Sequence, residues 1–269
     1  MPPANRVQLV IADVDGTLVT QDKVLTEGAR ASVRKMIAAG IAFTITSGRP
    51  PLGMKMLIEP LALKDPIAAF NGGVIVRPDL SVVRQHLLPQ GPAQQAAEII
   101  SQHGLDLWLY TDQDWFVRRL QAPHVDREQW TVKFPPKVAP TYNGLLGRAA
   151  KLVGVGDDYA AVARCEQEVQ RQCGAQVSAS RSQPYYLDVT HPEANKGAVV
   201  TVLSEMLRIP PENIATIGDG PNDVLMFRRS GLSIAMGNAA GEVQKAATFV
   251  TASNQEEGFA QAIERFVLS

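Results

Sequence analysis

The chain has 269 residues, with 26 lysines and arginines against 27 aspartates and glutamates, and 45% of its residues are hydrophobic. This hydrophobic share is that of a globular protein and excludes a chain disordered throughout, and the length suggests about two domains. The formal net charge of -1 offers no positive field to a phosphate backbone, which argues against nucleic-acid binding. No run free of charged residues reaches the roughly 18 residues that cross a bilayer, so we expect no membrane segment.

The cysteines and the N-terminus both favour the cytoplasm. Cys165 and Cys173 are two turns apart in a helix-like segment. This spacing favours a reduced pair over a disulfide or a metal site. Residues 1–6 contain no apolar signal core. We therefore expect a cytoplasmic protein.

The first third of the chain alternates between buried-type strands and amphipathic helices. Strands are predicted at 7–12, 41–45 and 66–70, where short apolar runs contain β-branched residues. A helix is predicted over 26–39, and another ends near Pro60. This order is typical of a doubly wound parallel sheet with helices on both faces.

The pattern changes over residues 79–185, which we interpret as an inserted α+β domain. The three tryptophans, Trp108, Trp115 and Trp130, all fall here and are expected in its core. The alternating pattern returns afterwards, so residues 1–78 and 186–269 are predicted to form one α/β core. The expected elements of the insert are helices 91–103 and 158–172 and strands 105–110, 115–118 and 175–180. Those after it are helices 197–207 and 222–229, strands 214–217, 232–235 and 248–250, and a last helix begun by a capping box from Ser253 to Glu256.

Polar clusters follow several of the predicted strands. Asp13 and Asp15 come directly after the first strand, and because residues i and i+2 of an extended segment face one side, their carboxylates converge. Close carboxylates raise each other's pKa unless a cation compensates, and a hard divalent cation is the simplest compensation. Asp219 and Asp223 form a second acidic cluster after strand 214–217.

Two further clusters suit an anion. Ser47 lies in the polar turn after strand 41–45, where freed backbone N–H groups precede a helix. Lys196 opens the helix that follows the insert. Ligands of open α/β sheets bind at the carboxyl ends of the strands, so we expect all four clusters at one site.

Taken in order, these clusters resemble the four motifs of the haloacid dehalogenase superfamily. D-x-D-G-T begins at Asp13, Ser47 ends the next strand, Lys196 precedes a helix, and G-D-x-x-N-D begins at Gly218. The position of the insert, between the Ser and Lys motifs, resembles the type IIB-capped, Cof-type phosphatases. Phe70-Asn71-Gly72-Gly73 and Leu187-Asp188-Val189-Thr190 are similar to that subfamily as well.

The resemblance implies a mechanism and a set of roles. Asp13 would be the nucleophile that forms an aspartyl-phosphate, and Asp15 the general acid and then the base, kept protonated by crowded negative charge. Gly16 and Thr17 would shape the turn that aims Asp15. Mg²⁺ would be held by Asp13, the carbonyl of Asp15, Asp219 and Asp223. The phosphate would be held by the N–H of Val14 and by Ser47, Lys196 and Asn222.

The insert would act as a lid that reads the leaving group, with Asn71, Gly72 and residues 185–191 as expected substrate contacts. The expected substrate is a small phosphomonoester such as a sugar phosphate. Two alternatives stay open: a phosphomutase or phosphotransferase on the same scaffold, and a non-catalytic module that binds phosphate esters. The oligomeric state is not readable. His86, His103, His124 and His191 show no metal-ligand spacing and are expected to be solvated or core residues.

Overall fold

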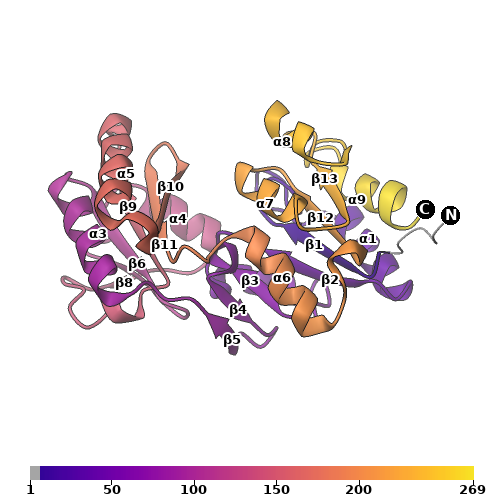
Figure 1. Ribbon diagram of the computed structural model, residues 1–269, viewed down its shortest axis with the longest axis horizontal. Helices are drawn as coiled ribbons and strands as arrows, with labels where there is room; N and C mark the ends of the chain where they lie inside the picture. The colour runs from indigo at the N-terminus through magenta and orange to yellow at the C-terminus, as the bar shows by residue number, and fades with distance from the viewer. Residues whose placement is uncertain (1–6) are drawn as a thin grey trace.

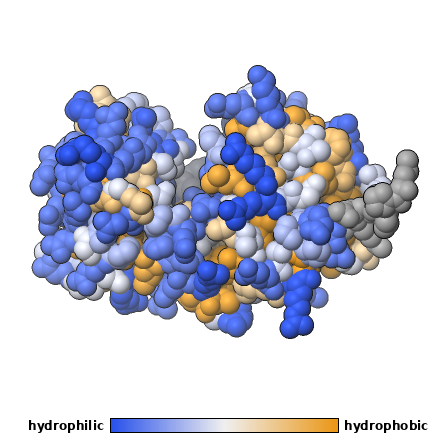
Figure 2. Space-filling model, viewed as in Figure 1, coloured by the Kyte–Doolittle hydropathy of each residue, from blue (hydrophilic) through white to orange (hydrophobic). Residues whose placement is uncertain are grey.

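The computed structural model describes residues 7–269 and contains two β-sheets, each in its own lobe (Figure 1). The expectation about residues 1–6 lies outside the described part of the chain. Within residues 7–269, no helix is both long and apolar enough to cross a membrane. Figure 2 shows a notch between the two lobes at the upper edge of the view.

The core lobe is built on a sheet that is parallel across most of its width. Strands β14 to β3 pair in parallel, and the β3–β4 and β4–β5 pairs are antiparallel. Because β1 lies between β2 and β12, the chain leaves β1 towards one side and later returns on the other. Across the sheet the order is β14 (Phe249–Val250), β13 (Leu232–Ala235), β12 (Ile214–Gly218), β1 (Leu9–Asp13), β2 (Ala42–Thr46), β3 (Ile67–Ala69), β4 (Val74–Val76) and β5 (Val82–Gln85).

Helices cover both faces of this sheet, so its central strand is buried on both sides. Val10 and Ala12 of β1 pack into one apolar cluster, while Leu9 and Ile11 pack into the cluster on the opposite face. This explains the continuous apolar run of the sequence. The first face is covered by α1 (Glu27–Ala38), α2 (Pro51–Ile58) and α9 (Gly258–Ala262), and the second by α6 (Lys196–Leu207), α7 (Val224–Phe227) and α8 (Gly241–Ala246).

The second lobe has a mostly antiparallel sheet whose two faces differ. Helices α3 (Gln90–Gln102) and α5 (Tyr159–Cys173) pack on the outer face. The inner face carries aromatic residues that belong to the same apolar cluster as the core lobe, and α4 (Val125–Val132) packs between this face and α2. The strand order is β10 (Ser178–Gln183), β11 (Tyr186–Thr190), β9 (Lys151–Val155), β6 (Asp106–Tyr110), β7 (Trp115–Val117) and β8 (Lys137–Val138).

The α/β class and the parallel core sheet are confirmed, but the sheets do not divide where the sequence suggested. Strand β5 lies beyond residue 78 and still belongs to the core sheet, and β11 lies beyond residue 185 and still belongs to the second sheet. The chain therefore passes between the sheets through residues 86–89 and 191–195. Residues 186–190 were included in the core although no strand was predicted there, because the segment Leu187–Thr190 precedes the Lys196 motif of the core.

Several local predictions were wrong for identifiable reasons. The last helix begins at Gly258, so the Ser253–Glu256 hydrogen bonds close a turn rather than cap a helix. Predicted helix 222–229 is a short 3₁₀ turn followed by the four residues of α7. Strands β4, β5, β8, β9 and β11 and helices α4 and α8 were missed, since most are too short to show a period.

The expected tryptophan core is confirmed for two of the three residues. Trp108 and Trp115 are buried, whereas Trp130 is 48% exposed on α4. Cys165 and Cys173 are free and buried on the inner side of α5.

Candidate active site

Four chain segments meet at the carboxyl edge of the core sheet. Asp13 is the last residue of β1, and Asp219 directly follows the neighbouring strand β12. These two strands flank the point where the strand order reverses, which is where open α/β sheets bind their ligands. Ser47 follows β2, the other neighbour of β1, and Lys196 opens α6. The expected gathering of Asp13, Ser47, Lys196 and Asp219 is therefore present.

A buried ion-pair network lies at the centre of the site. The Lys196 ammonium is 2.5 Å from Oδ1 of Asp13 and 2.6 Å from Oδ1 of Asp223. All three side chains are at least nine-tenths buried. An unpaired buried charge is costly, so each of these groups depends on the others for a charged partner.

The second oxygen of Asp223 holds the loop that carries Asp219. It accepts hydrogen bonds from the backbone N–H of Asp219 at 2.9 Å and of Gly220 at 2.8 Å. Gly218 makes room for this carboxylate, because a Cβ at residue 218 would lie 2.3 Å from Cγ of Asp223. Both oxygens of Asp223 thus have partners inside the protein, which favours a role in organising the loop and Lys196.

Asp219 is positioned from two sides and keeps lone pairs for a further ligand. Thr17 donates to its Oδ1 at 2.9 Å, and the Asn238 amide donates to its Oδ2 at 3.3 Å. The same amide donates to the carbonyl of Gly16, whose φ of +85° and missing Cβ allow Asp219 to approach closely. The turn after β1 and the loop after β12 are therefore joined directly.

The electrostatics of this cluster call for a cation in addition to Lys196. Carboxylate oxygens of Asp13, Asp219 and Asp223 all lie within 4.8 Å of one another. Burial, followed by the charges of Asp223 and Asp219, raises the pKa of Asp13 well above its usual range against the opposing effect of Lys196. Burial and Asp223 also raise the pKa of Asp219. A compact set of carboxylate oxygens, in which Asp13 and Asp219 have raised pKa values, fits Mg²⁺, a hard ion that takes oxygen ligands.

Asp15 does not have the environment expected from the sequence. Arg49 donates to both of its carboxylate oxygens at 2.7 Å, and Lys23 lies 2.7 Å from Oδ1. Burial alone would raise the pKa of Asp15, but Arg49 and Lys23 overcome this and lower it to about 2. The expectation that crowded negative charge keeps Asp15 protonated is therefore wrong: the carboxyl is ionised here, and its side chain is turned to Arg49.

The remaining predicted residues surround the cluster to different degrees. Val14 is buried in the turn after β1, and the hydroxyl of Ser47 accepts the backbone N–H of Arg49 at 3.1 Å. The amide of Asn222 donates to the side chain of Asn71 at 3.2 Å, which places Asn71 at the mouth of the site. Gly72 packs against the start of α6, because a Cβ on it would lie 2.6 Å from the Val199 side chain and 3.3 Å from the Asn195 carbonyl oxygen.

Sequence reasoning missed the partners of the acidic residues. Asn238 follows β13, so the rule that located the other clusters at strand ends would also have found it. Arg49 was visible in the turn after β2, but nothing in its spacing indicates an ion pair with Asp15. Lys23 lies in the loop between β1 and α1, where no periodic pattern marks it.

We predict that Lys196→Met destabilises the metal-free protein by about 3–5 kcal/mol, because it leaves Asp13 and Asp223 buried without a counter-charge. Urea unfolding followed by circular dichroism measures this change, and added Mg²⁺ should recover part of it. Lys35→Met, which removes an exposed ion pair with Glu264, is the control and should cost about 1 kcal/mol or less. Equal losses in the two variants would contradict the buried network.

Comparison with known proteins identifies the family. Residues 10–263 match the family described as haloacid dehalogenase-like hydrolase. The 5-amino-6-(5-phospho-D-ribitylamino)uracil phosphatase YwtE of Bacillus subtilis (strain 168) is 25% identical, covering 97% of this chain and 98% of its own. The pyridoxal phosphate phosphatase YbhA of Escherichia coli (strain K12) is 26% identical over 95% of this chain and 97% of its own. The crystal structure of a haloacid dehalogenase-like hydrolase from Bacteroides thetaiotaomicron superposes with a TM-score of 0.89 at 28% identity, covering 97% and 99% of the two chains. This chain belongs to the haloacid dehalogenase-like hydrolases, among their Cof-type phosphatases.

Proposed function

We propose that the protein is a Mg²⁺-dependent phosphatase that hydrolyses small phosphorylated metabolites, sugar phosphates or related phosphomonoesters, through an aspartyl-phosphate at Asp13. The observation that carries the proposal is the buried cluster in which Asp13, Asp219 and Asp223 lie within 4.8 Å beside the ammonium of Lys196. Such a site has a nucleophile, an oxygen-ligand set for Mg²⁺ and a fixed positive charge for phosphate.

The first step is attack of a carboxylate oxygen of Asp13 on phosphorus, in line with the leaving alcohol. Asp13, the carbonyl of Asp15 and Asp219 would hold Mg²⁺, which supplies positive charge that keeps Asp13 ionised and draws in the phosphate. Asp223 keeps the Asp219 loop and Lys196 in place. The equatorial oxygens would be met by the Lys196 ammonium and by the donors expected there, the N–H of Val14, Ser47 and Asn222.

Asp15 is proposed to carry the protons of the two steps. For the first step the Asp15 carboxyl must leave Arg49, whose ion pair keeps its pKa at about 2, take up a proton from solvent and give that proton to the leaving oxygen. It is then ionised and away from Arg49, and in the second step it takes a proton from the water that attacks the aspartyl-phosphate. We propose that the ion pair with Arg49 keeps Asp15 ionised until a substrate is bound.

The second lobe is proposed to be the lid that recognises the leaving group. The boundaries of this lid, expected near residues 79 and 185, are placed instead at residues 86–89 and 191–195, where the chain passes between the sheets. Its inner face touches the core lobe next to the site: the ring of Tyr110 lies 5.7 Å from that of Phe70, which precedes Asn71. Tyr110 donates to Glu128 of α4 at 2.7 Å. Burial raises the pKa of Glu128 even though Tyr110, Lys151 and Arg49 favour its charged form.

Unpaired polar atoms on this inner face indicate what the leaving group offers. Lys151 lies 2.7 Å from Oδ2 of Asp188, while Oδ1 of Asp188 and the hydroxyl of Tyr186 are buried without a hydrogen-bond partner among residues 7–269. Buried polar atoms without partners are unfavourable, and hydroxyl groups of a ligand would satisfy both. The relatives are named for different phosphate esters and so do not indicate one leaving group. The unpaired oxygens of Asp188 and Tyr186 are what support a leaving group that carries hydroxyls.

We further propose a cytoplasmic location and no nucleic-acid partner. The buried free thiols of Cys165 and Cys173 support a reducing compartment, and the near-neutral composition supports a small-molecule substrate.

Asp13→Asn should lower the turnover of a phosphate ester by at least about a thousandfold, since an amide oxygen is a poor nucleophile. Asp126→Asn, on an exposed position of α4, should leave turnover unchanged. Release of inorganic phosphate measures both. Transfer of the phosphoryl group to another hydroxyl in place of phosphate release would contradict hydrolysis, and wild-type turnover in Asp13→Asn would contradict the nucleophile.

Chelation of Mg²⁺ should stop hydrolysis, and re-addition should restore it. In Asp219→Asn, the Mg²⁺ concentration for half-maximal activity should rise by at least about tenfold, because one charged oxygen ligand is lost. A titration of Mg²⁺ against initial rate gives this value. The metal proposal fails if chelated wild-type protein keeps its full rate.

Asp188→Asn should raise KM for a hydroxyl-rich phosphate ester by about tenfold, because hydrogen bonds to a charged group contribute about 1.5–3 kcal/mol. KM for a simple aryl phosphate should stay the same. Asp114→Asn is the control: Asp114 forms an ion pair with Lys137 at the edge of the same sheet. Equal effects of Asp188→Asn on both substrates would show that the inner face does not read the leaving group.

A further inference from the structure

Two histidines that are far apart in the sequence lie together where the chain passes between the lobes. His86 is the first residue after β5, at the start of the passage into the second lobe. His191 is the first residue after β11, at the start of the passage back. Their rings stack at a centroid distance of 5.2 Å and an interplanar angle of 26°. The outgoing and returning passages are therefore side by side.

Glu193 completes a group of three potential metal ligands. Its Oε2 lies 3.1 Å from Nδ1 of His86, and one ligand atom from each of His86, His191 and Glu193 lies within 4.8 Å of the others. Ligands bound to one Zn²⁺ at about 2.0–2.2 Å are within roughly 4.4 Å of each other. Binding one ion therefore requires these side chains to rotate until their ligand atoms lie within about 4.4 Å of one another and the ring nitrogens point to the same position.

The returning passage is folded in a way that holds two of the ligands. The backbone N–H of Glu193 donates to Nδ1 of His191 at 3.2 Å, and the N–H of Ala194 donates to the His191 carbonyl at 2.9 Å. On the other passage, the N–H of His86 donates to the carbonyl of Gly73 in the core lobe at 2.7 Å. These hydrogen bonds hold the backbone next to each of the three ligands, so the approach to an ion is made by side-chain atoms.

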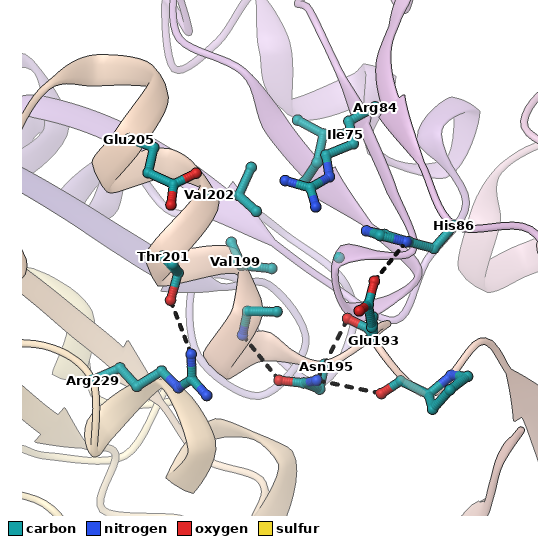
Figure 3. A pocket seen from close by; sticks show the side chains of 13 residues that line it. Ile75, Arg84, His86, Glu193, Asn195, Val199, Thr201, Val202, Glu205 and Arg229 are labelled. Atoms are coloured by element: carbon teal, nitrogen blue, oxygen red, sulfur yellow. Dashed lines mark hydrogen bonds and ion pairs between the residues drawn. The ribbon is translucent and has the colours of Figure 1, made fainter. Parts of the chain in front are cut away.

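Two members of the group, His86 and Glu193, line a groove of about 410 Å³ between β4, β5 and α6. Figure 3 shows the His86 ring and the Glu193 carboxylate facing each other in this groove. The Glu193 side chain is 64% exposed, so an ion can reach it.

Two imidazoles and one carboxylate favour a different metal ion from the one that the active-site carboxylates favour. Imidazole is a ligand for Zn²⁺, Ni²⁺, Cu²⁺ and Co²⁺, whereas the carboxylates of the active site suit Mg²⁺. Residues 7–269 contain two groups of three or more potential metal ligands: the carboxylates of the active site, and His86, His191 and Glu193 between the lobes.

We propose that His86, His191 and Glu193 form a second metal site, for a divalent transition-metal ion such as Zn²⁺, which bridges the two passages between the lobes. An ion there joins the end of β5 to the end of β11 and restrains the second lobe relative to the core lobe. The returning passage continues through Asn195 into Lys196, so the restraint also acts next to the active site. Turnover that requires the lid to open would then fall when this ion binds.

Calorimetric titration of the full chain with Zn²⁺ in excess Mg²⁺ tests the site without measuring activity. We expect one Zn²⁺ site in the wild type, weakened at least about tenfold in His86→Gln and in His191→Gln. The control His103→Gln, at the end of α3, should bind as the wild type does. Asp219→Asn, which disables the Mg²⁺ site, should retain Zn²⁺ binding, so failure of the proposed function is distinguishable from failure of this site.

The proposal is overturned if Zn²⁺ affinity in His86→Gln and His191→Gln stays within about twofold of the wild type, or if Asp219→Asn alone abolishes binding. Visible absorption of bound Co²⁺ gives an independent readout, because its bands change when a nitrogen ligand is lost. With Mg²⁺ saturating, Zn²⁺ should lower kcat of the wild type and of His103→Gln but not of His86→Gln. Binding that leaves kcat unchanged would overturn the restraint on the second lobe.

Discussion

The site depends on one buried ammonium that holds two carboxylates from opposite ends of the chain. Lys196 pairs with Asp13 on the first strand and with Asp223 on the loop after β12. Removing Lys196 leaves two buried carboxylates without a counter-charge, and removing either carboxylate takes away one of the two partners of the ammonium, so the network is complete only when all three segments are in place. This requirement couples the folding of the core to the assembly of the site, and it leaves Asp13 beside a fixed positive charge that a phosphate can share.

The sheet topology brings these residues together at little structural cost. Strands β1 and β12 are neighbours and run in parallel, so residues just beyond their ends meet at one edge without a long loop. Gly16 and Gly218 then allow the two acidic loops to approach more closely than side chains would permit. On the far side of the site, Arg49 binds Asp15, and its positive charge also favours the charged form of Glu128 in the second lobe, so one arginine interacts electrostatically with acidic groups of both lobes.

Much of the core lobe and most of the acidic site could be predicted from the sequence. Strands buried on both faces stand out as apolar runs, and parallel strands place the residues after them at one edge, which is how Asp13, Ser47 and Asp219 were found. Contacts between loops leave no such trace. The Arg49–Asp15 pair reversed the expected protonation of Asp15, and its cause lies in a side-chain geometry that no spacing encodes. In the same way, residues 186–190 were included in the core although they form a strand of the second sheet, because nothing in the sequence indicates which strands pair. His86 directly follows β5 of the core sheet, and His191 directly follows β11 of the second sheet. They lie together only because the chain passes between the two sheets at these residues.

The central claim is that Asp13 and Asp219 share one divalent ion beside Lys196. Anomalous diffraction from crystals grown with Mn²⁺ in place of Mg²⁺ tests it most directly. We predict an anomalous peak within bonding distance of carboxylate oxygens of both residues. A structure in which no peak contacts both carboxylates would contradict the account.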